Sequence, residues 1–90
     1  MKPDEAVFFA YCYFLRTKYH LHIRDVVACF EGLMHIKRIE YLLDKWSKLG
    51  FYNYGVSMDL GWFEDDKLPE RYRVILDSFS SCFREGEDKQ

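Results

Sequence analysis

The chain has 90 residues, a formal net charge of −2 and three cysteines, and 49% of its residues are hydrophobic. This length predicts one domain over residues 1–90 and excludes a multidomain enzyme. The hydrophobic content excludes a disordered chain. Three cysteines without a Cys-x-x-Cys pair fit neither a disulfide framework nor a zinc ribbon, so we expect a cytoplasmic protein. The apolar run from Ala6 to Leu15 is only about half as long as a membrane-spanning helix, so no membrane segment is expected.

Three helices are predicted in the first half of the chain. The first runs from Pro3 to about Tyr19 and is apolar nearly all round, which indicates that it packs on two partners. The second runs from about Arg24 to Glu31, and Gly32 is expected to end it as a left-handed cap. The third runs from about Met34 to Leu49, has one apolar and one mostly charged face, and ends at Gly50.

The pattern then changes to the alternation of a β-strand. Residues Tyr52 to Met58 alternate with period two, a turn is expected at Asp59 to Gly61, and Trp62 to Glu64 form the returning strand of a hairpin. The acidic residues 64–66 are expected to cap a last helix that begins near Leu68 or Pro69. The tail from residue 86 to residue 90 is expected to be frayed. These elements predict an α+β fold that is mostly α.

The order of these elements resembles that of winged helix-turn-helix domains. The stretch IRDVVACFEGLMHIKRIEYLLDKWSKLGFY is similar to the helix-turn-helix core of bacterial and phage winged-helix regulators, and YGVSMDLGWF resembles their wing. The resemblance spans about residues 7 to 83. It implies a three-helix core, a two-stranded wing and a C-terminal helix, and a transcriptional regulator that binds duplex DNA. Unlike a typical DNA-binding wing, this one carries acidic rather than basic residues at its tip.

The charges are distributed unevenly along the chain. Residues 16–48 hold seven basic and four acidic residues, a net +3, whereas residues 51–90 hold five basic and nine acidic residues, a net −4. The positive part coincides with the helix-turn-helix, where phosphate contacts would form. A solvated face of an amphipathic helix explains the same charges equally well. The residues expected to bind DNA are Arg24, His35, Lys37, Arg38, Tyr41, Lys45 and Lys48.

The terminal helices carry more apolar residues than one small monomer readily covers. Terminal helices pair two subunits in many winged-helix regulators, so the resemblance implies a homodimer. The alternative is that the two helices cover each other within one chain. The expected dimer interface consists of Phe9, Tyr13, Phe14, Phe79 and Phe83.

No arrangement of residues indicates catalysis, a cofactor or a metal site. His20 and His22 with a cysteine are more simply explained as loop residues than as zinc ligands. We therefore expect a protein that is not an enzyme. The alternative function is a non-catalytic interaction module, such as a phage or mobile-element accessory, inhibitor or immunity protein. It would bind a protein partner through its acidic wing and the aromatic residues Tyr52, Tyr54, Trp62 and Phe63.

Overall fold

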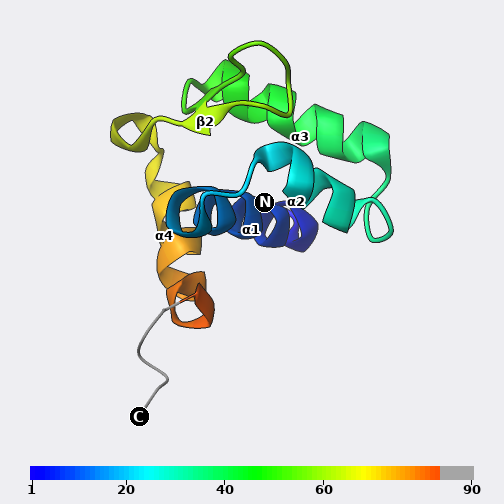
Figure 1. Cartoon of the computed structure of the whole chain (residues 1–90). Coiled ribbons are helices and arrows are strands. Elements are labelled where there is room, and N and C mark those ends of the chain that lie inside the picture. Colours follow the sequence, from blue (N-terminus) through cyan, green and yellow to red (C-terminus); the bar gives the residue numbers. More distant parts are fainter. Residues whose placement is uncertain (84–90) are drawn as a thin grey trace.

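The computed structural model describes residues 1–83 and confirms a mostly helical α+β fold (Figure 1). The expected frayed tail, residues 86–90, lies outside this range. Within residues 1–83, no helix is both long enough and apolar enough to cross a bilayer. The elements are α1 (Pro3–Tyr19), α2 (Ile23–Phe30), α3 (Ile36–Leu49), β1 (Tyr52–Asn53), β2 (Trp62–Phe63), the 3-10 turn η1 (Asp65–Lys67), α4 (Glu70–Phe79) and the 3-10 turn η2 (Ser80–Phe83).

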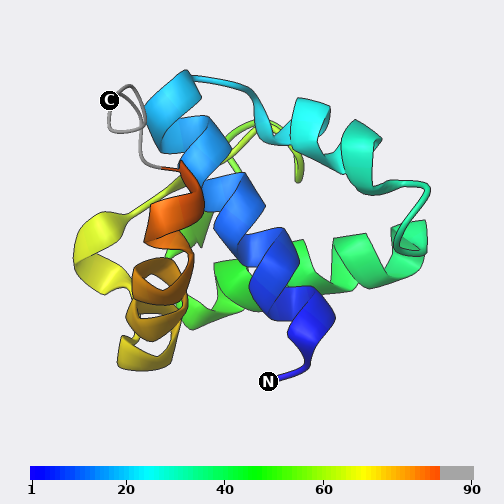
Figure 2. The same ribbon diagram turned by 90° about the horizontal axis from the view of Figure 1, so that it is seen from below.

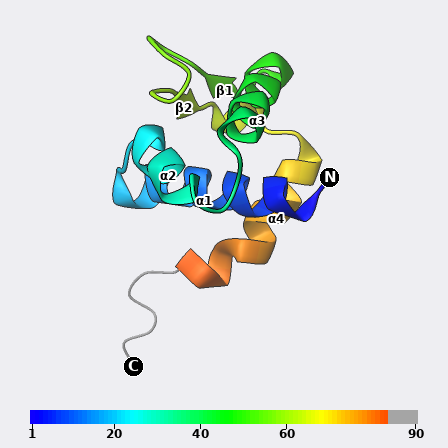
Figure 3. The same cartoon turned by 90° about the vertical axis from the view of Figure 1, so that its right-hand side faces the viewer.

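Helix α1 is the centre of the fold. In Figure 3, α3 and the hairpin lie above α1 and the end of α4 lies below it, while Figure 2 shows α1 crossing between α2 and α4. Phe9 is fully buried at this crossing, and its ring centre lies 5.3 Å from that of Trp46 on α3 and 4.9 Å from that of Tyr72 on α4. The helix is apolar nearly all round because its neighbours bury it on several sides.

The expectation of an exposed apolar face on the terminal helices is wrong for three of its five residues. Phe9, Phe14 and Phe83 are buried within the chain, and the rings of Phe14 and Phe83 stack with their centres 4.8 Å apart. Tyr13 and Phe79 are half-buried beside them. The apolar side chains of α1, α4 and η2 therefore cover one another within one chain, as the alternative interpretation stated.

The helix ends agree with the sequence in one place and differ in others. Gly50 ends α3 in the left-handed region, with a φ of 96°, as predicted. Gly32 is not left-handed: α2 ends at Phe30, whose carbonyl oxygen accepts the N–H groups of residues 33 and 34, each at 2.9 Å. The acids of residues 64–66 do not cap α4. Asp65 and Asp66 lie in η1 and Glu64 directly precedes it, while Pro69 precedes α4 without a side-chain cap.

The hairpin is present, but each of its strands has only two residues. Tyr52 pairs with Phe63 and Asn53 with Trp62 in an antiparallel ladder. The predicted continuation of the first strand to Met58 is wrong, because residues 54–61 form a loop. Gly55 turns the chain there with a φ of 71°, and its N–H donates to the side-chain oxygen of Asn53 at 3.3 Å.

The loop is folded over the side chain of Tyr52. The buried Tyr52 hydroxyl donates to the carbonyl oxygen of Met58 at 2.7 Å and accepts the N–H of Gly61 at 3.1 Å. One aromatic side chain thus supplies hydrogen bonds that a longer ladder would otherwise provide. The loop is held beside α3 by this contact and by Tyr54, whose hydroxyl donates to Asp44 at 2.9 Å.

Candidate nucleic-acid interface

Helix α3 separates an apolar face from a polar one. Its buried residues are Ile39, Leu42, Leu43 and Trp46. Lys37, Tyr41 and Lys48 lie on the opposite side and are exposed, with Tyr41 retaining 56% of its accessible surface. The spacing of these residues by three and four positions places each set on one face of the helix. The outward face is therefore fixed by the packing of the inward one.

His35 begins this helix. Its Nδ1 accepts the backbone N–H of Lys37 at 3.1 Å, so the imidazole satisfies one of the free donors of the first turn. This is the role that a serine or threonine fills at many helix starts. The side chain is exposed. His35, expected as a DNA contact, is thus first of all the cap that positions Lys37 and Arg38.

Arg38 is held by a carboxylate from the start of α1. Its Nε and Nη2 donate to the two oxygens of Asp4, each at 3.0 Å. The guanidinium also lies 5.7 Å from the centre of the Tyr41 ring. The hydrogen bond and charge of Arg38 hold the pKa of Asp4 below its ordinary value. The arginine is thereby fixed at the surface in one orientation.

Lys45 is tied to a buried carboxylate. Its Nζ donates to Glu5 Oε1 at 3.0 Å, and the Glu5 side chain is only 2% exposed. Glu5 Oε2 accepts two further hydrogen bonds, from Trp46 Nε1 at 3.0 Å and from the Tyr72 hydroxyl at 2.6 Å. Burial alone would raise the pKa of Glu5, but these hydrogen bonds and the charge of Lys45 lower it below the ordinary value. Glu5 is therefore ionised at neutral pH.

Two of the three remaining predicted cations also face acids. Lys48 Nζ lies 2.9 Å from Asp44 Oδ2 one helical turn away, and both side chains are well exposed. Arg24 Nε lies 3.8 Å from Asp59 Oδ2 in the loop, which is a weak contact. Exposed pairs of this kind contribute little to stability, because water screens them. Lys37 has no ion pair with any residue in the part of the chain that the structure describes.

The structure brings three of the predicted residues together. Arg38, Tyr41 and Lys45 line a shallow polar cleft of about 380 Å³ between α3 and the start of α1, with Lys2 and Glu5 on its other side. Sequence reasoning missed Asp4 and Glu5. Two acids in the first turn of a helix have a ready explanation in the helix dipole, and nothing in their spacing indicates contacts with a helix more than thirty positions later.

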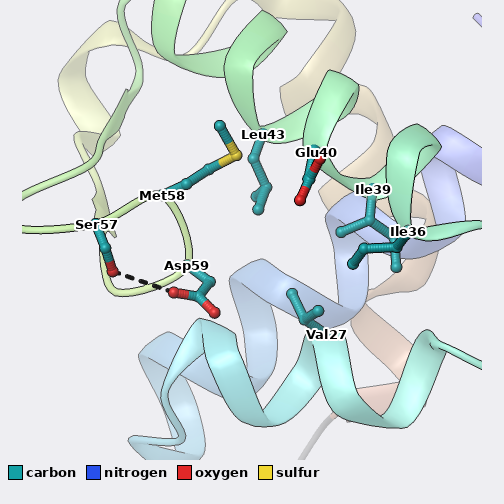
Figure 4. Close-up of a pocket in the computed structure, with 8 residues that line it drawn as sticks. All are labelled: Val27, Ile36, Ile39, Glu40, Leu43, Ser57, Met58 and Asp59. Carbon is teal, nitrogen blue, oxygen red and sulfur yellow. Dashed lines mark hydrogen bonds between the residues drawn. The ribbon is translucent and has the colours of Figure 1, made fainter.

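The opposite flank of α3 carries acidic rather than basic side chains. A pocket of about 250 Å³ lies there between α3, α2 and the loop (Figure 4). Val27, Ile39 and Leu43 are among its apolar lining residues, while Glu40 and Asp59 bring carboxylates to it from opposite sides. Ser57 Oγ donates to Asp59 Oδ1 at 3.2 Å. Phosphate groups would be repelled from this flank, so the cleft side of α3 is the more favourable one for an anion.

No metal centre is found in the described range, because no three histidine, cysteine or acidic side chains lie close enough together. No protein-family model matches the chain. Comparison with curated proteins and with solved structures likewise found no significant similarity.

Proposed function

We propose that this chain is a small winged helix-turn-helix protein, a transcriptional regulator that binds duplex DNA through α3. The order of three helices, a hairpin and a final helix supports this proposal. In such a domain the third helix enters the major groove and its first turns meet the base edges. On α3 these turns carry Lys37, Arg38 and Tyr41.

The observation that carries the proposal is the exposed face at the start of α3. Lys37 is exposed to solvent, Arg38 lies beside it with its guanidinium paired to Asp4, and Tyr41 adds an exposed ring with a hydroxyl group. Once the Asp4 carboxylate is displaced, the guanidinium fork of Arg38 suits the paired acceptors of guanine or a phosphate group. Lys45 and Lys48 would contact the phosphate backbone, whereas Arg24 faces Asp59 on the flank that repels phosphate groups.

The ion pairs set a limit on the strength of binding. Phosphate oxygens must replace carboxylates at Arg38 and Lys48, and this exchange costs little because the pairs are exposed. Lys45 exchanges less readily because Glu5 is buried and would lose its charged partner. We expect modest affinity and a log–log salt slope of about −2 to −4, because this chain would neutralise fewer phosphates than a strongly basic domain does.

A salt titration with random duplex DNA tests the proposal. The variant with Lys37→Glu and Arg38→Glu should lose measurable binding. A matched control with Lys67→Glu and Arg71→Glu makes the same change in net charge at exposed positions on η1 and α4, and should retain most of it. Absence of affinity for the unmodified protein at low salt contradicts the proposal, since phosphate contacts strengthen as salt falls.

A second candidate function is protein binding through the loop and its acidic edge. Val56 is 87% exposed and Trp62 is 42% exposed, a surface that a partner would cover. Glu64 accepts a hydrogen bond from Trp62 Nε1 at 3.1 Å, and Asp59 and the acids of η1 are close in the sequence; these acids favour a basic partner. Tyr52, expected to contact the partner directly, is instead buried beneath the loop. Binding of a partner that survives Lys37→Glu with Arg38→Glu but is lost in Trp62→Ala would favour this function.

A further inference from the structure

The pocket on the acidic flank of α3 joins three elements of the fold and is not used by the proposed DNA contacts. It lies between α2, α3 and the loop of residues 54–61, and its volume is about 250 Å³ (Figure 4). Pockets for drug-sized ligands range from about 300 to 1,000 Å³, so this one has room for a smaller molecule. Five of its eight lining residues are apolar and come from all three elements: Val27, Ile36, Ile39, Leu43 and Met58.

Two carboxylates give this pocket its charge. Glu40 on α3 and Asp59 on the loop stand on opposite sides of it, and none of the eight lining residues is basic (Figure 4). Glu40 is exposed and has no ion pair within residues 1–83. Negative charges beside apolar walls produce a negative potential in the space between them. The pocket therefore attracts a cation and repels an anion.

Asp59 is available to a ligand as well. Its Oδ1 accepts a hydrogen bond from Ser57 Oγ at 3.2 Å, which orients the carboxylate. Its Oδ2 lies 3.8 Å from Arg24 Nε, too far for a hydrogen bond, and the 63% exposed Arg24 side chain does not line the pocket. A cation in the pocket can thus approach Oδ2 without displacing a hydrogen-bond partner found in residues 1–83.

An organic cation suits this site better than a metal ion does. Mg²⁺ and Ca²⁺ require about six or more oxygen ligands, and within residues 1–83 no three histidine, cysteine or acidic side chains lie close enough together to hold a metal. An ammonium group needs only acceptors for its three N–H donors, which carboxylates provide. A hydrocarbon chain attached to it would cover the apolar walls and remove them from water.

We propose that this pocket binds a small primary alkylammonium ion. The ammonium group lies between Glu40 and Asp59 and donates to their carboxylates, and the hydrocarbon chain lies against Val27, Ile36 and Met58. The bound ion connects α3 to the loop. The proposal does not rest on DNA binding, because the pocket and the polar cleft lie on opposite flanks of α3.

An NMR titration of the isotopically labelled chain with n-hexylammonium chloride at constant ionic strength tests the proposal. The amide signals of the lining residues should shift and saturate at millimolar concentrations. n-Hexanol has the same hydrocarbon chain without the charge, and ammonium chloride has the charge without the hydrocarbon chain. Each should bind about ten-fold more weakly or worse, because each lacks one of the two interactions.

Two variants with the same change in charge test the role of Glu40. Glu40→Gln should raise the dissociation constant of n-hexylammonium about five-fold or more, because the amide keeps the size of the side chain but not its charge. Glu70→Gln on α4, outside the pocket, should leave it nearly unchanged. Both side chains are exposed, so both variants should fold as the parent does, which the amide spectrum of the free protein checks.

Several outcomes would overturn the proposal. One is the absence of saturable binding of n-hexylammonium to the unmodified chain. Equal affinity for n-hexanol would show an apolar crevice without selection for charge, and equal weakening in the two variants would show attraction by net charge alone. Binding of a lysine-rich peptide without binding of n-hexylammonium would assign the pocket to a protein partner instead.

Discussion

The hydroxyl of Tyr72 donates a 2.6 Å hydrogen bond to Glu5 Oε2 and so joins α4 to α1 across 67 positions of the chain. The same carboxylate accepts hydrogen bonds from Lys45 and Trp46 on α3. One buried anion therefore connects three helices and holds Lys45, which lines the candidate DNA cleft. Within the described residues, no buried side-chain nitrogen or oxygen lacks a partner, so the cost of burying these polar groups is met by hydrogen bonds.

The first prediction concerns the stability that Glu5 provides. Glu5→Leu leaves the donors of Lys45, Trp46 and Tyr72 without their acceptor, and we expect the free energy of unfolding to fall by about 3 kcal/mol. Urea denaturation followed by tryptophan fluorescence measures the change. Glu40→Leu is the control, because Glu40 is exposed and has no ion pair within residues 1–83, and it should alter stability by less than about 0.5 kcal/mol. Equal losses in both variants would contradict the role of the buried carboxylate.

The second prediction concerns the loss of folding stability at acid pH. The pKa of Glu5 is lower in the folded chain than its ordinary value of 4.5, and Asp4 is lowered from 3.8. A carboxyl group with a lowered folded pKa stabilises the fold above its unfolded pKa, and this contribution is lost as the pH falls through the folded value. The free energy of unfolding should therefore decline below about pH 4.5, measured by urea titrations across the acid range. Glu5→Gln should flatten the decline, and an unchanged pH profile in that variant would refute the assignment.

The buried face of α3 was predictable from the sequence, whereas the burial around α1 was not. Ile39, Leu42, Leu43 and Trp46 repeat at helical spacing on one side only, so their pattern determines which face packs inward. Helix α1 has apolar residues on all sides, and its pattern cannot distinguish a second subunit from α4. Only the folded chain shows that Phe14 meets Phe83.

The loop and the ion pairs were beyond sequence reasoning for related reasons. The sequence of residues 52–58 alternates with the period of a strand. The chain nevertheless turns at Gly55, and the hydrogen bond of the Tyr52 hydroxyl holds the loop in place of strand pairing. The basic residues of the candidate site are exposed or half-buried, and their binding to DNA stays a prediction. Their partners Asp4 and Glu5 were not predicted, because a contact between α1 and α3 depends on the crossing of the two helices and not on local spacing.

The third prediction concerns the loop. A Cβ atom at Gly61 would lie 2.0 Å from the carbonyl oxygen of Asn53 and 2.8 Å from the Tyr52 ring, so Gly61→Ala forces the backbone of the hairpin apart. We expect a loss of about 2–3 kcal/mol in the free energy of unfolding, measured by urea denaturation. Gly32→Ala is the matched control, since nothing lies within 4 Å of its Cβ position and its φ is not positive. A tolerated Gly61→Ala would show that the loop does not hold this conformation.

The last prediction concerns Asp4 as a competitor of DNA for Arg38. Asp4→Asn removes the charge that holds the guanidinium and leaves Arg38 available to a phosphate group. Because a phosphate group no longer has to displace the carboxylate from Arg38, we expect affinity for random duplex at low salt to rise, while the log–log salt slope, about 0.9 for each phosphate neutralised, changes little. Fluorescence anisotropy over a series of salt concentrations measures both. Asp66→Asn makes the same charge change on η1, away from α3, and should raise affinity less and leave the slope unchanged. If the two variants behave alike, the gain comes from net charge alone and Arg38 does not contact phosphate.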